Sequence, residues 1–161
     1  MVYVDGKFDY AANKEAAETF ITEYILPYIR YCKVTDGTIL ADKDSGTAQT
    51  KRVYLNNGTT FEVKNGGCLD IYFDANGDNN PNENGKDIFT FTFCNDPEFQ
   101  LSYFGNTNQY FGPLAYTDGP NSIESYNTRD KALAQCKESP STCSVLLQRY
   151  DNFEFKEDYP W

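Results

Sequence analysis

Two segments in the middle of the chain alternate apolar with polar side chains, and each carries a cysteine at one end. These segments are residues 68–73 and 88–94. If Phe73 lies opposite Phe89 in an antiparallel pair, the apolar residues of both segments share one face and Cys68 lies opposite Cys94. A shift of one residue would break both matches, because neighbouring strand residues point to opposite faces. The sequence therefore predicts a hairpin with this register.

The residues before this hairpin predict two further strands. Residues 52–55 and 59–63 are rich in β-branched and aromatic side chains and flank a turn at 56–58 with the sequence Asn-Asn-Gly. We therefore expect an antiparallel β-meander over residues 51–94. Residues 33–50 are rich in Asp, Gly, Ser and Thr, which is typical of a loop.

An amphipathic helix is predicted over residues 9–32, with Asp9 as its N-cap. Pro27 interrupts the pattern, so we expect a kink or an early end there. The apolar stripe recurs at spacings of three and four residues and consists of Ala17, Phe20, Ile21, Tyr24, Tyr28 and Cys32. We expect this stripe to pack on the apolar face of the hairpin as core, rather than to form a cofactor site.

The last part of the chain, residues 95–161, is predicted to be loop-rich. Short strands are expected around residues 99–104, a short helix over 127–137, and a last strand or short helix within 144–155. The predicted fold class is therefore α+β, with a long N-terminal α-helix packed on an antiparallel β-sheet meander and a short C-terminal helix. The length argues for a single globular domain over residues 1–161.

Composition excludes several classes of function. The formal net charge of −10 opposes binding to nucleic acid or to an anionic membrane. The chain has no histidine, which removes His-ligated zinc sites and nucleophile systems that depend on histidine. Neither a signal peptide nor a run of ~20 apolar residues is visible, so we expect no membrane span. Met1 fits either a natural start or a chain trimmed of a hydrophobic leader.

The connection between the hairpin strands, residues 74–87, is long and acidic, with four acidic residues and one lysine. A divalent cation would relieve the repulsion between these carboxylates, and calcium accepts six to eight oxygen ligands in flexible geometry. The predicted calcium ligands are Asp74, Asn76, Asp78 and Asp87. The spacing is not that of an EF-hand. The alternative is an ordinary polar loop held by Asx turns.

The five cysteines favour disulfides and an oxidising compartment, because no close cysteine pairs with metal-ligand spacing occur. Cys136 and Cys143 enclose a short polar loop that suits a local disulfide, and Cys68–Cys94 would close the hairpin. Cys32 is left over, and it is also a candidate partner for Cys68 or Cys94. Five reduced, buried thiols are the remaining alternative.

Nothing in the sequence singles out a catalytic group. Acidic residues are plentiful, but no pair stands out as the two carboxylates of a glycosidase. Four aromatic residues in the loop-rich part are candidates for stacking on sugars, although core packing is the commoner role. They are Tyr103, Phe104, Tyr110 and Phe111. We therefore predict that the protein is not an enzyme.

Three stretches of the chain resemble the globular part of type IV pilin-like proteins, including the pseudopilins of type II secretion. They are the N-terminal amphipathic helix leading into a loop and meander, the acidic loop 74–87 followed by Ile-Phe, and the Cys136–Cys143 helix-loop followed by the chain end 157–161. The acidic loop is the more specific of these, since it follows the pattern D-x-N-G-D-x-x-P-N-x-x-G-x-D.

The resemblance implies a pilin-like fold and a structural, non-catalytic subunit of a filament at the cell surface or in the periplasm. It also implies calcium in the acidic loop and contacts with other pilin-like subunits through a hydrophobic N-terminal half-helix, which this sequence lacks. Contact with a membrane would also depend on that segment. Because the same segment packs subunits together in the filament core, the chain as given is not expected to polymerise unaided. The alternative function is a secreted calcium-dependent binding or adhesion module for a carbohydrate or host surface. A hydrolase that uses carboxylates is a third class.

Overall fold

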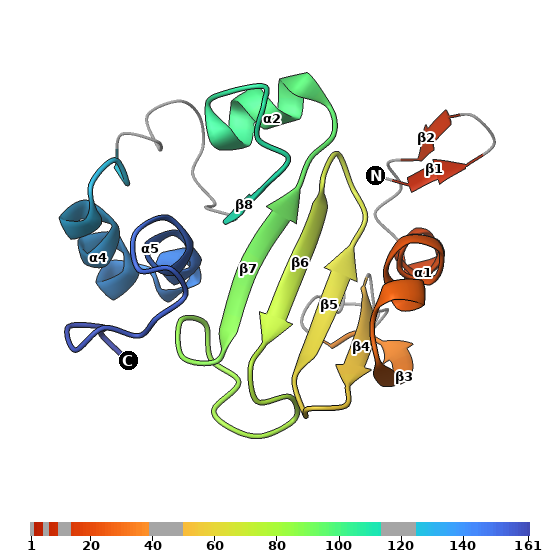
Figure 1. Cartoon of the computed structure of the whole chain (residues 1–161), viewed down its shortest axis with the longest axis horizontal. Helices are drawn as coiled ribbons and strands as arrows, with labels where there is room; N and C mark the ends of the chain where they lie inside the picture. Colours follow the sequence, from red (N-terminus) through yellow and green to blue (C-terminus); the bar gives the residue numbers. More distant parts are fainter. Residues whose placement is uncertain (1, 5–6, 10–13, 39–49, 114–124) are drawn as a thin grey trace, which may run out of the picture.

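A six-stranded antiparallel sheet with the strand order β3-β4-β5-β6-β7-β8 dominates the computed structural model (Figure 1). Its strands are β3 (Tyr31–Asp36), β4 (Lys51–Leu55), β5 (Thr60–Lys64), β6 (Leu69–Asp74), β7 (Ile88–Phe93) and β8 (Phe111–Pro113). A separate hairpin pairs β1 (Val2–Val4) with β2 (Lys7–Asp9). The structure describes residues 2–4, 7–9, 14–38, 50–113 and 125–161.

The central hairpin has the predicted register. Phe73 pairs with Phe89 and Ile71 pairs with Phe91 across β6 and β7. The two cysteines beyond the strand ends, Cys68 and Cys94, form a disulfide. Strands β4 and β5 also occur where the meander was predicted, and they pair with one another and with β6.

The predicted long N-terminal helix is wrong. The helical segment begins at Lys14 and consists of three short pieces, which are α1 (Lys14–Phe20), a π-helical turn (Ile21–Ile25) and a 3-10 turn (Leu26–Tyr28). Asp9 is not an N-cap, because it lies in β2. Pro27 lies in the 3-10 turn, and the chain then becomes extended. The fold is therefore a six-stranded antiparallel sheet with short helices, and not the pilin-like arrangement of a long helix packed on a meander.

The segment that follows this helix also differs from the prediction. Residues 33–36 were predicted as loop, but they belong to β3, which pairs with β4 at the edge of the sheet. The β-branched residues Val34 and Thr35 favour this extended conformation. The rest of the predicted loop, residues 39–49, lies outside the described residues.

The C-terminal part contains more helix than the sequence predicted. Residues 97–104 form α2 (Pro97–Phe104) in place of the expected strand, because Asp96 caps the helix and Pro97 occupies its first turn. The predicted short helix is α4 (Arg129–Glu138), capped by Thr128. A further helix, α5 (Cys143–Arg149), follows a 3-10 turn (Pro140–Thr142). No helix in the described parts of the chain has the length and apolar character needed to cross a bilayer.

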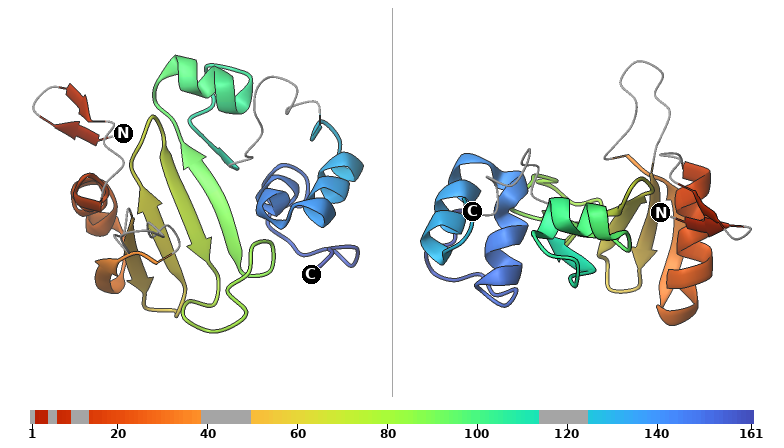
Figure 2. Two further views of the ribbon diagram at one scale, coloured as in Figure 1. Left: turned by 180° about the vertical axis from the view of Figure 1, so that it is seen from behind. Right: turned by 90° about the horizontal axis from the view of Figure 1, so that it is seen from above.

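One face of the sheet is apolar and carries two separate clusters of buried side chains. Near β4 and β5, Ile21 of the N-terminal helical segment packs with Val53 and Val63. Near β7, Leu146 of α5 packs with Phe89 and other side chains of the same sheet face. The two helical parts therefore cover opposite ends of this face, as Figure 2 shows. Ile71 and Phe73, which lie between the clusters, contact both.

The opposite face of the sheet is polar although much of it is buried. Its buried residues include charged, amide and hydroxyl side chains, notably Arg52, Thr60, Glu62, Asp74, Thr90 and Thr92. Because burial of an unpaired charge is costly, these groups must form hydrogen bonds and ion pairs with one another. The acidic loop joins this polar face at the end of β6.

Candidate functional site

The acidic loop begins at Asp74, whose carboxylate ties the loop to its own backbone. Asp74 Oδ1 accepts hydrogen bonds from the backbone N–H groups of Asn76 at 3.2 Å and Gly77 at 2.9 Å. This is the Asx-turn arrangement that Asp favours at the start of a turn. Gly77 has φ 69°, and a Cβ atom there would lie 2.4 Å from the carbonyl oxygen of Gly58. The turn therefore requires glycine.

Asp87 closes the other end of the loop in the same way. Its Oδ1 accepts from the backbone N–H of Glu83 at 2.7 Å, and its Oδ2 accepts from the backbone N–H of Asn82 at 2.9 Å. Asn76 Nδ2 donates to Asp87 Oδ2 at 2.9 Å and to the carbonyl oxygen of Asn80 at 3.1 Å. A cis peptide bond precedes Pro81. The polar residues of the loop are therefore bonded chiefly to one another.

A buried arginine lies at the base of the loop. Arg52, on β4, is 5% exposed. Its Nη2 lies 3.0 Å from Asp74 Oδ2 and 3.3 Å from Asp78 Oδ1, and its Nη1 lies 3.4 Å from Glu62 Oε1. Nη2 also donates to Thr60 Oγ1 at 2.8 Å. One guanidinium thus faces three carboxylates.

Burial and hydrogen bonding shift the pKa of Asp74 in opposite directions. Burial raises the pKa of this carboxyl above its ordinary value, because desolvation disfavours the charged form. The backbone N–H groups of Asn76 and Gly77 and the charge of Arg52 lower its pKa, but by less than burial raises it. The net result is a pKa for Asp74 above the ordinary value of an aspartate.

The four predicted calcium ligands lie in one loop, but their side chains have different partners. Asp74 and Asp78 face Arg52, while Asn76 and Asp87 bond to each other. Asp78 is 68% exposed at its side chain. In the described part of the chain, no group of three or more His, Cys, Asp or Glu residues is arranged to hold a metal ion. Calcium binding therefore stays a prediction, although both carboxylate oxygens of Asp74 and of Asp87 already accept hydrogen bonds from N–H groups.

A polar cavity of about 470 Å³ lies beside the loop. Its described lining consists of Thr38, Arg52, Asp74, Asp78, Asn82, Asn84 and Ile88. Tyr54 extends the polar surface, because its hydroxyl donates to Asp78 Oδ1 at 3.2 Å. The cavity is therefore rich in oxygen atoms and already contains the positive charge of Arg52.

The acidic loop also packs against the C-terminal part of the chain. The Tyr159 hydroxyl donates to the carbonyl oxygen of Gly85, and burial raises the pKa of Tyr159. Gly85, at φ 79°, is so close to α5 that an added Cβ would lie 3.0 Å from Cys143 Sγ. Lys86 Nζ lies 5.7 Å from the centre of the Trp161 ring. The acidic loop and the C-terminal part of the chain therefore form one structural unit at the lower end of the sheet (Figure 1).

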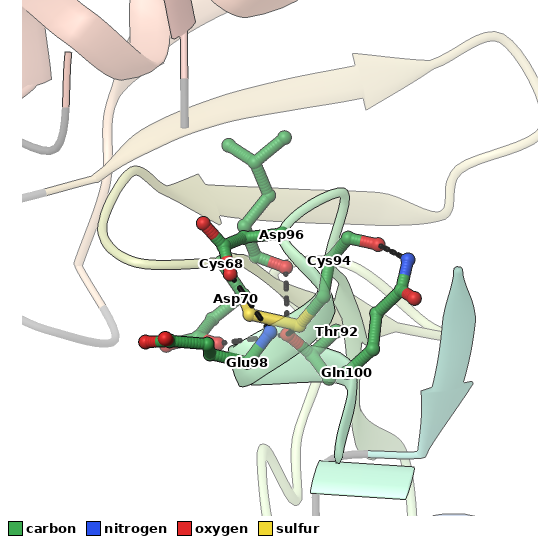
Figure 3. The surroundings of a disulfide bond; sticks show 8 residues. Cys68, Asp70, Thr92, Cys94, Asp96, Glu98 and Gln100 are labelled. Carbon is green, nitrogen blue, oxygen red and sulfur yellow. Dashed lines mark hydrogen bonds between the residues drawn. A yellow bond between two sulfur atoms is a disulfide. The ribbon is translucent and has the colours of Figure 1, made fainter. Parts of the chain in front are cut away.

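Both favoured disulfides are present. Cys68 is bonded to Cys94 and Cys136 to Cys143, while Cys32 is an exposed free thiol. Figure 3 shows that the first disulfide lies beside the start of α2, where Gln100 Nε2 donates to the carbonyl oxygen of Cys94 at 3.0 Å. Disulfides of this kind persist in oxidising compartments.

An apolar groove of about 400 Å³ opens on the other face of the sheet, beside α5. Sequence reasoning missed this feature, because its walls come from segments far apart in the chain. They are Ile71, Phe73, Ala75, Phe89, Phe91, Phe111, Leu147, Phe153 and Phe155. Phe153 and Phe155 remain 56% and 59% exposed. We call this feature the apolar groove.

The four aromatic residues considered for sugar stacking are not gathered at one site. Phe104 is buried beside the Cys68–Cys94 disulfide, and Phe111 lines the apolar groove. Tyr103 and Tyr110 are partly exposed, at 38% and 51%. Arg52 was also missed, although its position opposite Glu62 in the predicted meander was a usable signal.

The chain belongs to a family described as a family of unknown function, DUF6613, which matches residues 4–161. No curated protein and no solved structure matches the chain.

Proposed function

We propose that this protein is a non-catalytic structural subunit of a filament of the type IV pilus or secretion pseudopilus class, outside the cytoplasm. One observation carries the proposal. The two stretches that most resemble pilin-like chains, the acidic loop and the C-terminal end, pack on each other through Tyr159 and Gly85. The two stretches that carry the resemblance are thus joined in one structural unit.

The proposal rests on this unit and not on the N-terminal helix, which is short in this fold. The disulfides Cys68–Cys94 and Cys136–Cys143 are consistent with a place at the cell surface or in the periplasm. The absence of histidine from the sequence is consistent with a structural rather than a catalytic role. Its partners would then be other subunits of the same assembly.

Immunogold electron microscopy on the cells that make the protein tests this proposal. Antibodies are raised against the purified chain, and the control serum is first absorbed with the same chain. We expect gold particles along the length of surface filaments, and their loss with the absorbed serum. Label spread over the cell surface, or protein recovered only from the medium, would contradict a filament subunit.

A secreted binding module is the second candidate, and the apolar groove favours it. Pockets of this size lined by aliphatic and aromatic side chains are typical of ligand sites. The test is saturable binding of the apolar dye ANS. The variants Phe153→Ser and Phe155→Ser should lose this binding, whereas Phe99→Ser, outside the groove, should retain it. Equal binding by all three variants would remove the support for this candidate.

A further inference from the structure

We propose that the acidic loop, residues 74–87, keeps its fold without a metal ion, because Arg52 and the loop's own N–H groups take the places that a divalent cation would fill. This inference concerns the same acidic loop that supports the filament proposal, but its test does not depend on whether the chain forms filaments. It concerns why a chain would place so many carboxylates in one connection.

The positive charge comes from β4. Arg52 is buried and lies within ion-pair distance of Asp74 and Asp78, two of the predicted ligands, as well as Glu62. Its guanidinium carries five N–H donors in a fixed planar arrangement that suits several carboxylates at once. A divalent cation placed between Asp74 and Asp78 would have to approach or displace this fixed positive charge, which Coulomb repulsion opposes.

The carboxylate oxygens of Asp74 and Asp87 receive N–H donors from the loop itself. Asp74 Oδ1 accepts two backbone N–H groups, and the oxygens of Asp87 accept from Asn82 N, Glu83 N and Asn76 Nδ2. An N–H group directed at a carboxylate presents its positive end where a cation would lie. The loop motif D-x-N-G…P-N-x-x-G-x-D is thus explained by turns and caps within the chain.

One buried side-chain oxygen of the loop has no donor among the described residues. Asn76 Oδ1 is buried and makes no hydrogen bond there. A single buried amide oxygen does not make a calcium site, because calcium takes six to eight oxygen ligands. A cation at Asp87 would compete for its oxygens with Asn82 N and Glu83 N.

Hydrogen exchange and thermal unfolding test the inference with the wild-type protein. We expect the backbone N–H groups of Gly77, Asn82 and Glu83 to be equally protected in excess calcium and in chelator, because their acceptors are Asp74 and Asp87 in both conditions. The Tm should also be the same. Protection of the loop only in calcium would overturn the proposal, and so would a Tm that rises with calcium through an ion located in the loop.

Terbium luminescence gives an independent readout, because Tyr54 donates to Asp78 and would sensitise an ion bound in the loop. We expect no saturable emission that calcium displaces. If such emission appears, the variants Tyr54→Phe and Asp78→Asn locate it. Emission lost in both variants would place the ion in the loop and overturn the proposal, whereas emission unchanged in both would place it elsewhere and support a metal-free loop.

Discussion

Arg52 Nη2 lies 3.0 Å from Asp74 Oδ2, and the side chains of both residues are almost fully buried. This ion pair crosses β5 and connects β4 to the end of β6, where the acidic loop begins. The same guanidinium reaches Glu62 on β5. The pair therefore joins three strands on the polar face and fixes one end of the loop.

Replacing Arg52 should strongly destabilise the fold. Arg52→Met removes the buried positive charge that faces Asp74 and Glu62, and breaking a buried ion pair in this way costs about 3–5 kcal/mol. The matched control is Lys51→Met, whose partners Glu18 and Asp36 are exposed, and it should cost about 1 kcal/mol or less. Urea unfolding of the two variants measures this difference, and equal losses would contradict the role assigned to Arg52.

The two disulfides should differ in their effect on stability. Cys68–Cys94 spans a separation of 26 residues and Cys136–Cys143 a separation of 7, so the loop-entropy model gives about 3.5 and about 2.4 kcal/mol respectively. Paired Cys→Ser variants of each bond, unfolded in urea, test the order. A larger loss for the shorter loop would show that local packing, rather than loop closure, dominates.

Cys32 should be the reactive thiol of the folded protein. It is exposed on β3, whereas the other four cysteines are in disulfides. Maleimide labelling without reductant should therefore add one label per chain, and peptide mapping should place it at Cys32. Cys32→Ser should abolish labelling. Label at any of the other cysteines would contradict the pairing.

Acid should weaken the contact between α4 and the C-terminal end. Arg129 binds Asp151 and Asp158, and its hydrogen bonds to Asp158 lower the pKa of that carboxyl below its ordinary value of 3.8. Because the folded state holds this proton less tightly than the unfolded chain, the stabilisation is complete above that value and is lost as the pH falls through the lowered pKa. The Tm of Asp158→Asn should therefore approach that of wild type only in strong acid. A difference in Tm between Asp158→Asn and wild type that stays constant across pH would contradict this pH dependence.

Asp70 should show the opposite dependence on pH. Burial raises its pKa, with only partial relief from Lys64 and from its hydrogen bond to Thr92. The folded state then binds this proton more tightly than the unfolded chain, so stability falls as the pH rises through the raised pKa. Asp70→Asn should therefore raise the Tm at neutral pH and lose this gain in acid. The control variant is Glu98→Gln, at an exposed position near the Cys68–Cys94 disulfide, and it should produce no gain in Tm (Figure 3).

The central hairpin was predictable because two independent constraints selected one register. The apolar alternation paired Phe73 with Phe89, and the cysteines required the same alignment. The end of the N-terminal helix was not predictable in this way. The apolar spacing continues through Tyr28 and Cys32, but β4 offers a partner strand, and pairing with it places Cys32 in β3. Tertiary contacts thus override the helical periodicity.

The acidic loop was recognised as unusual, but its arginine partner was not. Counting nearby charges predicted a bound cation and could not find Arg52, which precedes Asp74 by 22 residues and reaches it only after β4, β5 and β6 pair. The apolar groove was missed for the same reason, because Phe153 and Phe155 meet Phe73 and Phe89 only in the folded chain. Spacing along the sequence reports local turns and strand registers better than such distant contacts.

A crystal structure of the protein grown in excess calcium tests the role of Arg52 most directly. Our account predicts the Arg52 guanidinium between Asp74 and Asp78, with backbone N–H groups on Asp74 and Asp87 and no ion among them. A calcium ion coordinated by Asp74, Asn76, Asp78 and Asp87, with Arg52 turned away, would contradict it.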